Sequence, residues 1–312
     1  MSSHNMNGTA IFSIEIELAW GYHDLTRANK FGALSADRST ETDALERLLI
    51  LCDKLDIPIT FDIVGHLLLD ECPGVHKGEY PNGWFNADPG TNTDTDPLFY
   101  APDLIDRILE AETDHEICTH TFSHALGEGF SPAQLDDDLS VAQETHQREL
   151  GSRATSLVPP RHQSMDADVL KHNRIDVVRQ TKGKMPDTRP ALLYWYLIRN
   201  HPVVKPSHED GLTTTYTSVV QSMTAPYIAH GQRDPPRFLG SVPLRVRKRF
   251  HRRYVADALD RAAESGAHAH FWTHLHDMAN EPQLDVVEQV LRLTQQRRES
   301  GAITVSKMEE LA

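Results

Sequence analysis

The middle of the chain contains two histidines, His120 and His124, that are four residues apart. If a helical turn begins here, both imidazoles project from the same face. Two imidazoles in that relation can bind one divalent metal ion, because both nitrogens reach a common point about 2.0–2.1 Å away for zinc. The zinc-protease pattern His-Glu-x-x-His is absent, since Thr119 follows His115-Glu116 at the required offset. With 18 histidines in the chain, a surface or core-edge role is the alternative for each.

A second group with chemical potential lies near the amino end. Residues 10–18 read as a buried strand, in which Glu15 and Glu17 are two apart and share one face. A solvated acidic face is the alternative interpretation. The neighbouring segments Ile11-Phe12 and Leu18-Ala19-Trp20 are apolar, however, and a buried carboxylate needs a cation, a metal or dense hydrogen bonding. The pair is therefore a candidate site.

Two further clusters follow predicted strands. Pro160-Arg161-His162-Gln163 comes directly after residues 154–158. Near the carboxyl end, the period of a strand places five side chains on one face while the strand lasts. These are His268, His270, Trp272, His274 and His276.

Size and composition limit the class of protein. A chain of 312 residues with 39% apolar residues is long enough to bury a core, and no apolar run approaches the roughly 18–20 residues of a membrane span. The first eight residues are polar and lack the features of a secretion signal. Three cysteines, Cys52, Cys72 and Cys118, show no CxxC pairing and argue against a disulfide framework. We therefore expect a cytoplasmic protein.

The net charge of −14 disfavours a nucleic-acid binder or a binder of anionic membranes, whose surface would be basic. Arginine far outnumbers lysine. An acidic surface poor in lysine is similar to that of proteins from salt-loving cells, which favours a halophilic source such as a haloarchaeon. An acidic protein from a mesophile is the alternative.

Predicted strands alternate with predicted helices along the chain, which indicates parallel strands with helical crossovers. We expect a flexible N-terminus over residues 1–9 and one domain over 10–312. Strands are expected over 10–18, 57–64, 114–118, 154–158, 175–179, 237–243, 267–277 and 302–305. Helices are expected over 42–55, 103–111, 132–150, 166–172, 191–198, 247–265 and 282–298. The segments 71–97 and 180–236 have no clean period and are expected to be irregular excursions.

In a parallel α/β fold the functional site lies at the carboxyl ends of the strands. The acidic pair, the histidine pair, Arg161 and the histidines 274 and 276 all follow predicted strands. One carboxylate with two histidines is a catalytic metal set that leaves positions open for water and substrate.

The order of these motifs resembles the polysaccharide deacetylases of the NodB homology type (carbohydrate esterase family 4). Glu15-Ile16-Glu17 is similar to the family's first motif, and His120-Thr121-Phe122-Ser123-His124 to its second. Pro160-Arg161-His162-Gln163 resembles its third motif, and Phe271-Trp272-Thr273-His274-Leu275-His276 its last. The resemblance implies a distorted (β/α)7-type barrel, with a divalent metal held by Glu17, His120 and His124.

The same resemblance implies roles in the hydrolysis of a carbohydrate N-acetyl group. Glu15 would be the general base, Arg161 would orient it, and His274 would be the general acid, with His276 as its alternative. Both acids of the first motif are glutamates where the family usually has aspartates, which leaves the reach of the base open. A further family motif between Arg161 and His274 is not identified.

Zinc is the expected metal, although two imidazoles and a carboxylate also suit cobalt, manganese, nickel or iron. The expected substrate is an intracellular glycan or a glycolipid precursor. Two alternatives stay open, namely hydrolysis of a small non-sugar amide on the same fold and a metal- or glycan-binding protein without catalysis. Four aromatic residues are candidates to stack on a sugar ring, although core packing is the commoner role of each. They are Trp84, Phe85, Tyr100 and Trp195.

Overall fold

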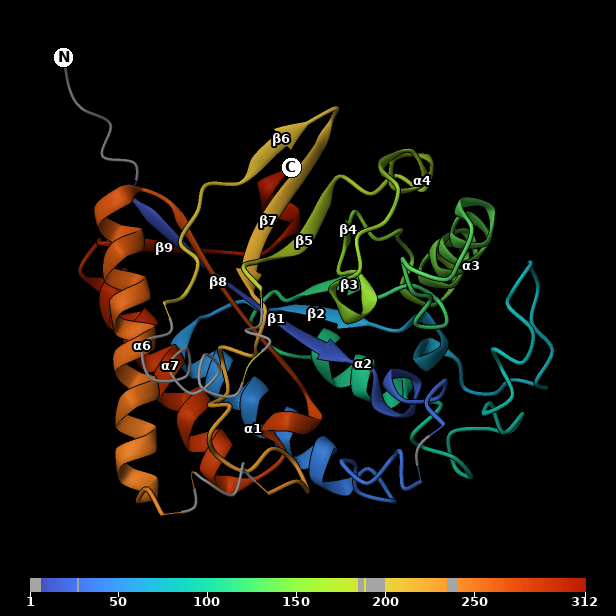
Figure 1. Cartoon of the computed structure of the whole chain (residues 1–312), viewed down its shortest axis with the longest axis horizontal. Helices are drawn as coiled ribbons and strands as arrows, with labels where there is room; N and C mark the ends of the chain where they lie inside the picture. Colours follow the sequence, from blue (N-terminus) through green and yellow to red (C-terminus); the bar gives the residue numbers. More distant parts are fainter. Residues whose placement is uncertain (1–6, 27, 185–187, 189–199, 235–238, 240) are drawn as a thin grey trace.

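Strand β1 (Gly8–Ile16) is buried along its entire length and pairs with three other strands (Figure 1). The computed structural model describes residues 7–26, 28–184, 188, 200–234, 239 and 241–312. The two faces of β1 have different neighbours, as the period of a strand requires. Phe12 and Ile14 belong to the main apolar core, which lies between the sheet and the helices, whereas Ile11 packs with Val158, Val177 and other residues in a separate small cluster.

Seven parallel strands form a closed barrel, because β1 pairs with β2 on one side and with β8 on the other. In ring order after β1, the strands are β2 (Thr60–Ile63), β3 (Glu116–Thr119), β4 (Ser156–Leu157), β5 (Val177–Lys182), β7 (Leu212–Ser218) and β8 (His268–His274). Strand β9 (Ile303–Ser306) lies parallel to the first half of β1, and β6 (Ser207–Glu209) is antiparallel to β7. The predicted (β/α)7-type barrel in a single domain is therefore confirmed.

Helices flank this barrel (Figure 1), and α6 packs on α7, α7 on α1, α1 on α2 and α3 on α4. They are α1 (Ser39–Leu55), α2 (Pro102–Leu109), α3 (Pro132–Leu150), α4 (Ala167–His172), α6 (Leu244–Ser265) and α7 (Glu281–Glu299). Helix α3 has the predicted bounds, because signals in the sequence define both of its ends. Ser131 and Gln134 form a capping box at its start with Pro132 in the first turn, and Gly151 ends it at φ 78°. Among the described helices, none combines the length and apolar composition of a membrane span.

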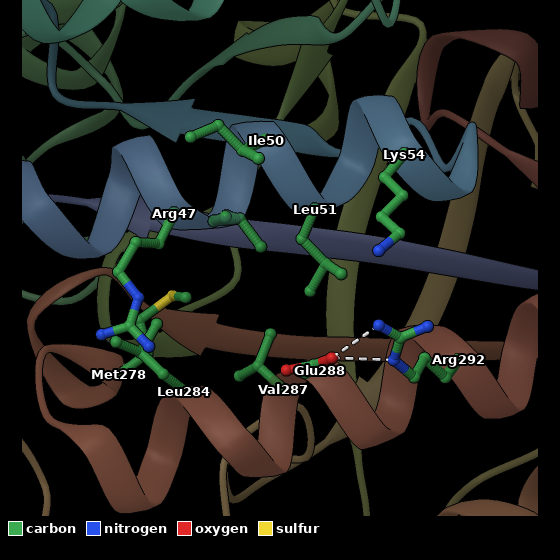
Figure 2. Close-up of a pocket in the computed structure, with 10 residues that line it drawn as sticks. Arg47, Ile50, Leu51, Lys54, Met278, Leu284, Val287, Glu288 and Arg292 are labelled. Carbon is green, nitrogen blue, oxygen red and sulfur yellow. Dashed lines mark hydrogen bonds and ion pairs between the residues drawn. The ribbon is translucent and has the colours of Figure 1, made fainter.

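Helices α1 and α7 meet on the outside of the barrel, where Leu51, Leu284 and Val287 line a groove (Figure 2). Glu288 accepts hydrogen bonds from Arg292 one turn later, at 2.7 and 2.8 Å. This groove holds aliphatic contacts with a charged rim, and it contains no group of metal-ligating side chains. The groups of metal-ligating side chains among the described residues lie in other parts of the fold.

The expected irregular segment 71–97 has no helix or strand, apart from one antiparallel bridge between Glu71 and Asn92. The prediction for 180–236 was incomplete, because this segment supplies the barrel strand β7 and its hairpin partner β6. The predicted helix over 191–198 lies outside the described residues. Residues 237, 238 and 240 of the predicted strand over 237–243 also lie outside them, and the described residues 239 and 241–243 are not in a strand, so that prediction is wrong for the part that can be compared.

Short segments follow the carboxyl ends of the barrel strands and thus gather at one rim. They are η1 (Leu18–Gly21) after β1, η2 (Gly65–Leu68) after β2, residues 120–124 after β3, η3 (Pro160–His162) after β4 and η5 (His276–Met278) after β8. Because all barrel strands run the same way, these segments lie at the same end of the barrel.

Candidate metal and hydrolase site

Glu17, His120 and His124 converge at this rim. The Oε1 atom of Glu17 lies 3.1 Å from Nε2 of His120 and 3.2 Å from Nε2 of His124. All three residues are buried. The side chain that directly follows β1 thus meets two from the segment after β3, although more than 100 positions separate them in the sequence.

The backbone around these three residues differs from the expected one. β1 ends at Ile16, so Glu17 lies just beyond the strand and directly before η1. Residues 120–124 form an irregular turn instead of a helical one, with Thr121 at φ 65° and His124 at φ 60°. The predicted helical turn is therefore wrong, although both imidazoles still reach the same oxygen.

Buried hydrogen bonds fix this turn. Asp138 on α3 accepts the backbone N–H groups of Phe122 at 2.8 Å and Ser123 at 3.2 Å, and the Ser123 hydroxyl at 2.5 Å. His120 Nδ1 lies 2.7 Å from the carbonyl oxygen of Val158. Because a carbonyl only accepts, Nδ1 carries a proton, and Nε2 is the atom that can either donate to Glu17 or bind a metal ion.

These three residues fit a divalent metal. Two nitrogens bound to zinc at about 2.0–2.1 Å with tetrahedral angles lie about 3.3 Å apart, close to the observed nitrogen–oxygen separations. Both Nε2 atoms point to one carboxylate oxygen, and Nδ1 of His124 is buried without a hydrogen-bond partner in the described structure. The set has three protein donors, which leaves coordination positions for water and substrate.

Glu15 lies beside this group, near the end of β1, and pairs in register with Asp62 of β2 and His274 of β8. Its Oε1 atom accepts a hydrogen bond from Arg179, and its Oε2 atom lies 3.2 Å from His274 Nε2. Burial alone would raise the pKa of the Glu15 carboxyl, but the charges of Arg179 and His274 outweigh burial and lower that pKa to about 2. Glu15 is thus a carboxylate at neutral pH.

Arg179 of β5 makes the contact with Glu15 that we expected of Arg161. Its guanidinium is 1% exposed and also donates to Ser13 Oγ at 2.6 Å and to Asp62 Oδ2 at 3.2 Å. It lies 4.9 Å from the centre of the Trp272 ring. Inside the barrel it is the positive charge between two buried carboxylates.

Arg161 instead forms a bidentate pair with Asp24 at the mouth of the site. Its backbone is left-handed, at φ 52°, which turns the side chain toward the segment after η1. The guanidinium still lines the pocket but does not contact Glu15. The expectation that Arg161 orients Glu15 is corrected for this reason.

His274 is held in place by Asp277, whose Oδ2 accepts the Nδ1 proton at 2.7 Å. Gln221 donates to the same oxygen at 2.8 Å. Burial alone would lower the pKa of His274, but Glu17, Glu15 and Asp277 raise that pKa well above its ordinary value. His276 points elsewhere, with Nε2 2.6 Å from the Tyr22 hydroxyl. The geometry thus places His274, and not His276, next to Glu15.

A pocket of about 280 Å³ opens above these residues, and its wall includes Tyr22, His162, Arg233 and Trp272. Burial lowers the pKa of His162 to about 4, and its ring packs edge-on against Trp272. None of the aromatic residues that were candidates for sugar stacking lies in this wall among the described residues. Trp84, Phe85 and Tyr100 pack in or against buried clusters, and Trp195 lies outside the described residues.

Sequence reasoning missed Arg179 and Asp277. Both gave a signal in retrospect. Arg179 is a charged residue at the end of the predicted buried strand 175–179, and a buried charge needs a partner. Asp277 follows His274 by three residues, which brings a carboxylate next to an imidazole if the strand turns after His274.

Comparisons with known proteins agree with this picture at the level of fold. A family model described as polysaccharide deacetylase matches residues 26–176, just under half of the chain. That segment contains His120, His124 and Arg161 but not Glu15, Glu17, Arg179 or His274. No curated protein matches the sequence.

Solved structures cover nearly the whole chain. A protein from Mycobacterium smegmatis named as a candidate polysaccharide deacetylase has a TM-score of 0.62 at 12% identity, over 100% of this chain and 91% of that chain. The allantoinase Puue has a TM-score of 0.59 at 12% identity, over 99% and 90%. A candidate polysaccharide deacetylase from Pseudomonas aeruginosa PAO1 has 0.55 at 13%, over 97% and 89%. At these identities the likeness shows a common barrel fold.

Proposed function

We propose that this protein is a metal-dependent hydrolase that removes N-acetyl groups from a carbohydrate. One observation carries the proposal. The donor atoms of Glu17, His120 and His124 meet at 3.1–3.2 Å, and the Glu15–His274 pair lies directly beside them at the same rim. A binding site for a cation thereby adjoins a carboxylate and an imidazole that can move protons.

A divalent cation held by Glu17, His120 and His124 would act as a Lewis acid toward the acyl carbonyl and would lower the pKa of water. The chain's own residues supply the remaining steps. Arg179 holds one oxygen of Glu15, so Oε2 faces the pocket as a carboxylate that can accept a proton from the attacking water. Although glutamates stand where the family usually has aspartates, Oε1 of Glu17 lies 3.1–3.2 Å from both imidazoles and Oε2 of Glu15 lies 3.2 Å from His274 Nε2.

His274 is proposed as the acid that protonates the leaving amine. Its Nδ1 proton is engaged by Asp277, so the proton at Nε2, next to Glu15 and the pocket, is the one available for transfer. Without this proton the tetrahedral adduct would expel water again in preference to the amine. His274 therefore has the position that the step needs.

The match of residues 26–176 to the polysaccharide deacetylase family supports a carbohydrate substrate. A small non-sugar amide is the second candidate. It is favoured by the modest volume of the pocket and by Arg161 and Arg233 in its wall. The described residues among the expected stacking candidates, Trp84, Phe85 and Tyr100, are also absent from that wall. Two guanidinium groups would suit an anionic or carbonyl-rich small molecule.

Acetate release from N-acetylated sugars, and amine release from small amides, separate the candidates when each is measured with metal and with chelator. We expect sugar deacetylation that chelator abolishes and that Glu15→Gln abolishes without loss of bound metal. Glu264→Gln, on the exposed face of α6, is the matched control and should retain activity. Turnover of small amides alone would favour the second candidate. Bound metal without turnover of either substrate class would contradict both.

A further inference from the structure

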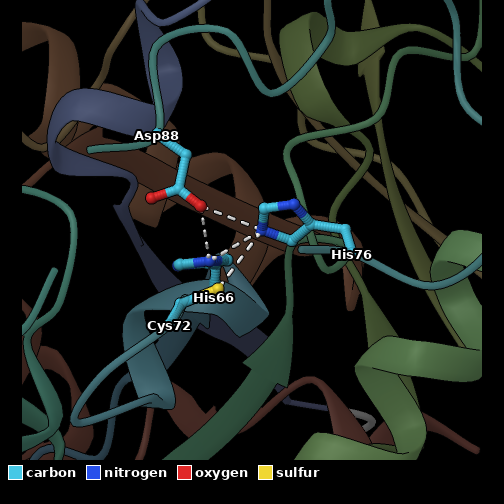
Figure 3. A group of neighbouring side chains, drawn as sticks. All are labelled: His66, Cys72, His76 and Asp88. Carbon is cyan, nitrogen blue, oxygen red and sulfur yellow. Dashed lines mark hydrogen bonds and ion pairs between the residues drawn. The ribbon is translucent and has the colours of Figure 1, made fainter. Parts of the chain in front are cut away.

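A second group of metal-ligating side chains lies after β2, separate from the site described above. It consists of His66 in η2 together with Cys72, His76 and Asp88 from the excursion that follows (Figure 3). Figure 3 shows the two imidazoles, the thiol and the carboxylate turned toward one another. Sequence reasoning identified this excursion as irregular but did not find the cluster.

The distances within the cluster match the edges of a tetrahedral metal site. Nε2 of His76 lies 3.3 Å from Nε2 of His66 and 3.5 Å from Sγ of Cys72. Oδ2 of Asp88 lies 3.0 Å from Nε2 of His76 and 3.6 Å from Nε2 of His66. Around zinc, two nitrogens are expected about 3.3 Å apart, and a nitrogen and a sulfur about 3.6 Å apart. All four donor atoms lie within 4.8 Å of one another.

The atoms that would bind the ion are oriented by neighbours on their far sides. Asp88 Oδ1 accepts hydrogen bonds from the Tyr100 hydroxyl at 2.6 Å and from Gly90 N–H at 3.1 Å. Nδ1 of His66 lies 3.4 Å from the Phe99 carbonyl oxygen, which favours a proton on Nδ1 and a lone pair on Nε2. These contacts leave the inward atoms of both residues directed at the common centre.

Hydrogen bonding alone does not account for the cluster. The Asp88 side chain is 1% exposed, and its Oδ2 atom lies 3.0 Å from His76 Nε2 without hydrogen-bond geometry to that imidazole or to any other described group. One proton between the two Nε2 atoms would satisfy only that pair, whereas four donor atoms face the same point. Buried polar atoms of this kind need a shared partner.

We propose that His66, Cys72, His76 and Asp88 bind a structural zinc ion. Four protein donors fill a tetrahedral shell, so this site has no open position for substrate. The thiolate and two imidazoles suit zinc among the divalent ions of the cell. On binding, the Cys72 thiol releases its proton to solvent and the sulfur bonds the ion, with no change in oxidation state.

The ion would link residues 71–97 to η2, the segment that follows strand β2 of the barrel. Cys72 and Asp88 lie near the two ends of this excursion, where Cys72 N–H also donates to Thr91 O at 2.9 Å, whereas His66 belongs to the segment directly after β2. Between these ends, Trp84 donates to Ser123 Oγ at 2.8 Å, inside the His120–His124 turn. The second site therefore stabilises a segment that contacts the first.

Metal analysis and cobalt substitution test this proposal independently of the proposed function. Wild-type protein should bind two equivalents of zinc, and Cys72→Ser should bind one. After replacement by Co²⁺, wild type should show a near-ultraviolet sulfur-to-cobalt charge-transfer band. The site formed by Glu17, His120 and His124 contains no sulfur and cannot give this band. His120→Ala should therefore keep the band, and Cys52→Ser, whose thiol lies in the main core, should keep it as well.

Absence of the band from cobalt-loaded wild type would overturn the proposal, as would its persistence in Cys72→Ser. If Cys72→Ser does not fold, His76→Ala is the second variant and should lose one equivalent of zinc. A single equivalent that disappears with Cys72→Ser but not with His120→Ala would support this site while contradicting the proposed catalytic one. A single equivalent with the opposite dependence would do the reverse.

Discussion

Replacement of Arg179 by glutamine tests whether Arg179, and not Arg161, positions Glu15. Arg179 is the buried cation between Glu15 and Asp62, and both carboxylates are at most 3% exposed. Removing one partner of a buried ion pair leaves an uncompensated charge and destabilises a protein by about 3–5 kcal/mol. Asp62 can relieve part of this penalty, because burial already raises its pKa to about 7. We therefore expect the lower end of that range.

Arg161→Gln is the matched control. Its pair with Asp24 is partly exposed, with side chains 33% and 16% accessible, so its loss should cost about 0–1 kcal/mol. Urea denaturation would measure the free energy of unfolding of both variants. The kcat for N-acetylated sugars should fall further in Arg179→Gln than in Arg161→Gln. Arg179 fixes the position of the Glu15 carboxylate, and a small displacement of a catalytic base lowers the rate by about 10²-fold.

Arg179→Lys keeps a charge but loses the planar contact with two carboxylates. It should have a higher free energy of unfolding than Arg179→Gln and still a lower kcat than wild type. The prediction for kcat can therefore be tested even if Arg179→Gln does not fold. A larger loss of kcat in Arg161→Gln than in either variant at position 179 would refute this role of Arg179. Unfolding of Arg179→Gln at the same urea concentration as wild type would refute it as well.

Three further predictions concern the metal, the acid and the core. Alanine at His120 or His124 should remove one equivalent of metal from folded protein, measured by elemental analysis and circular dichroism; retained metal in both variants would contradict the assignment. Asp277→Asn should lower kcat by about 10²-fold or more with little change in KM, because His274 loses the carboxylate that orients it; an unchanged kcat would exclude this role. Burial lowers the pKa of His146 in the folded protein to about 4. Between pH 6.5 and pH 4 the imidazole therefore binds a proton in the unfolded chain but not in the folded one. The free energy of unfolding should drop by about 3 kcal/mol over that range. In urea titrations His146→Leu should lose this share of the acid sensitivity, and an acid sensitivity equal to that of wild type would refute the effect.

Local signals allowed much of the fold to be predicted from the sequence. Helix α3 has a capping serine, a first-turn proline and a terminal glycine, and its predicted bounds agree with the structure. Strand β1 is a short apolar run whose alternation correctly separated Glu15 from the apolar face. In such segments the residues that decide the conformation lie close together in the sequence.

Strand β7 could not be predicted in this way. Its sequence Leu-Thr-Thr-Thr-Tyr-Thr-Ser lacks an apolar alternation, and β5 and β8 on either side stabilise it. A polar strand of this kind is recognisable only when its neighbours are known. The same holds for the cluster of His66, Cys72, His76 and Asp88, which depends on the path of an irregular excursion.

The candidate site shows a similar division. The spacing of His120 and His124 and the pair Glu15 and Glu17 indicated residues that the structure brings together. The choice between Arg161 and Arg179 depended on side-chain direction across the barrel, because Arg161 follows one predicted strand and Arg179 is the last residue of the next. The left-handed backbone at Arg161 directs it away from Glu15, and no pattern in the sequence specifies that turn.

Crystals grown with zinc and measured at the zinc absorption edge would test the central claim most directly. We expect an anomalous peak about 2.0–2.1 Å from Nε2 of His120, Nε2 of His124 and a carboxylate oxygen of Glu17, with Glu15 beside the peak but not bound to the metal. A zinc-loaded crystal with no peak among these three residues would contradict it.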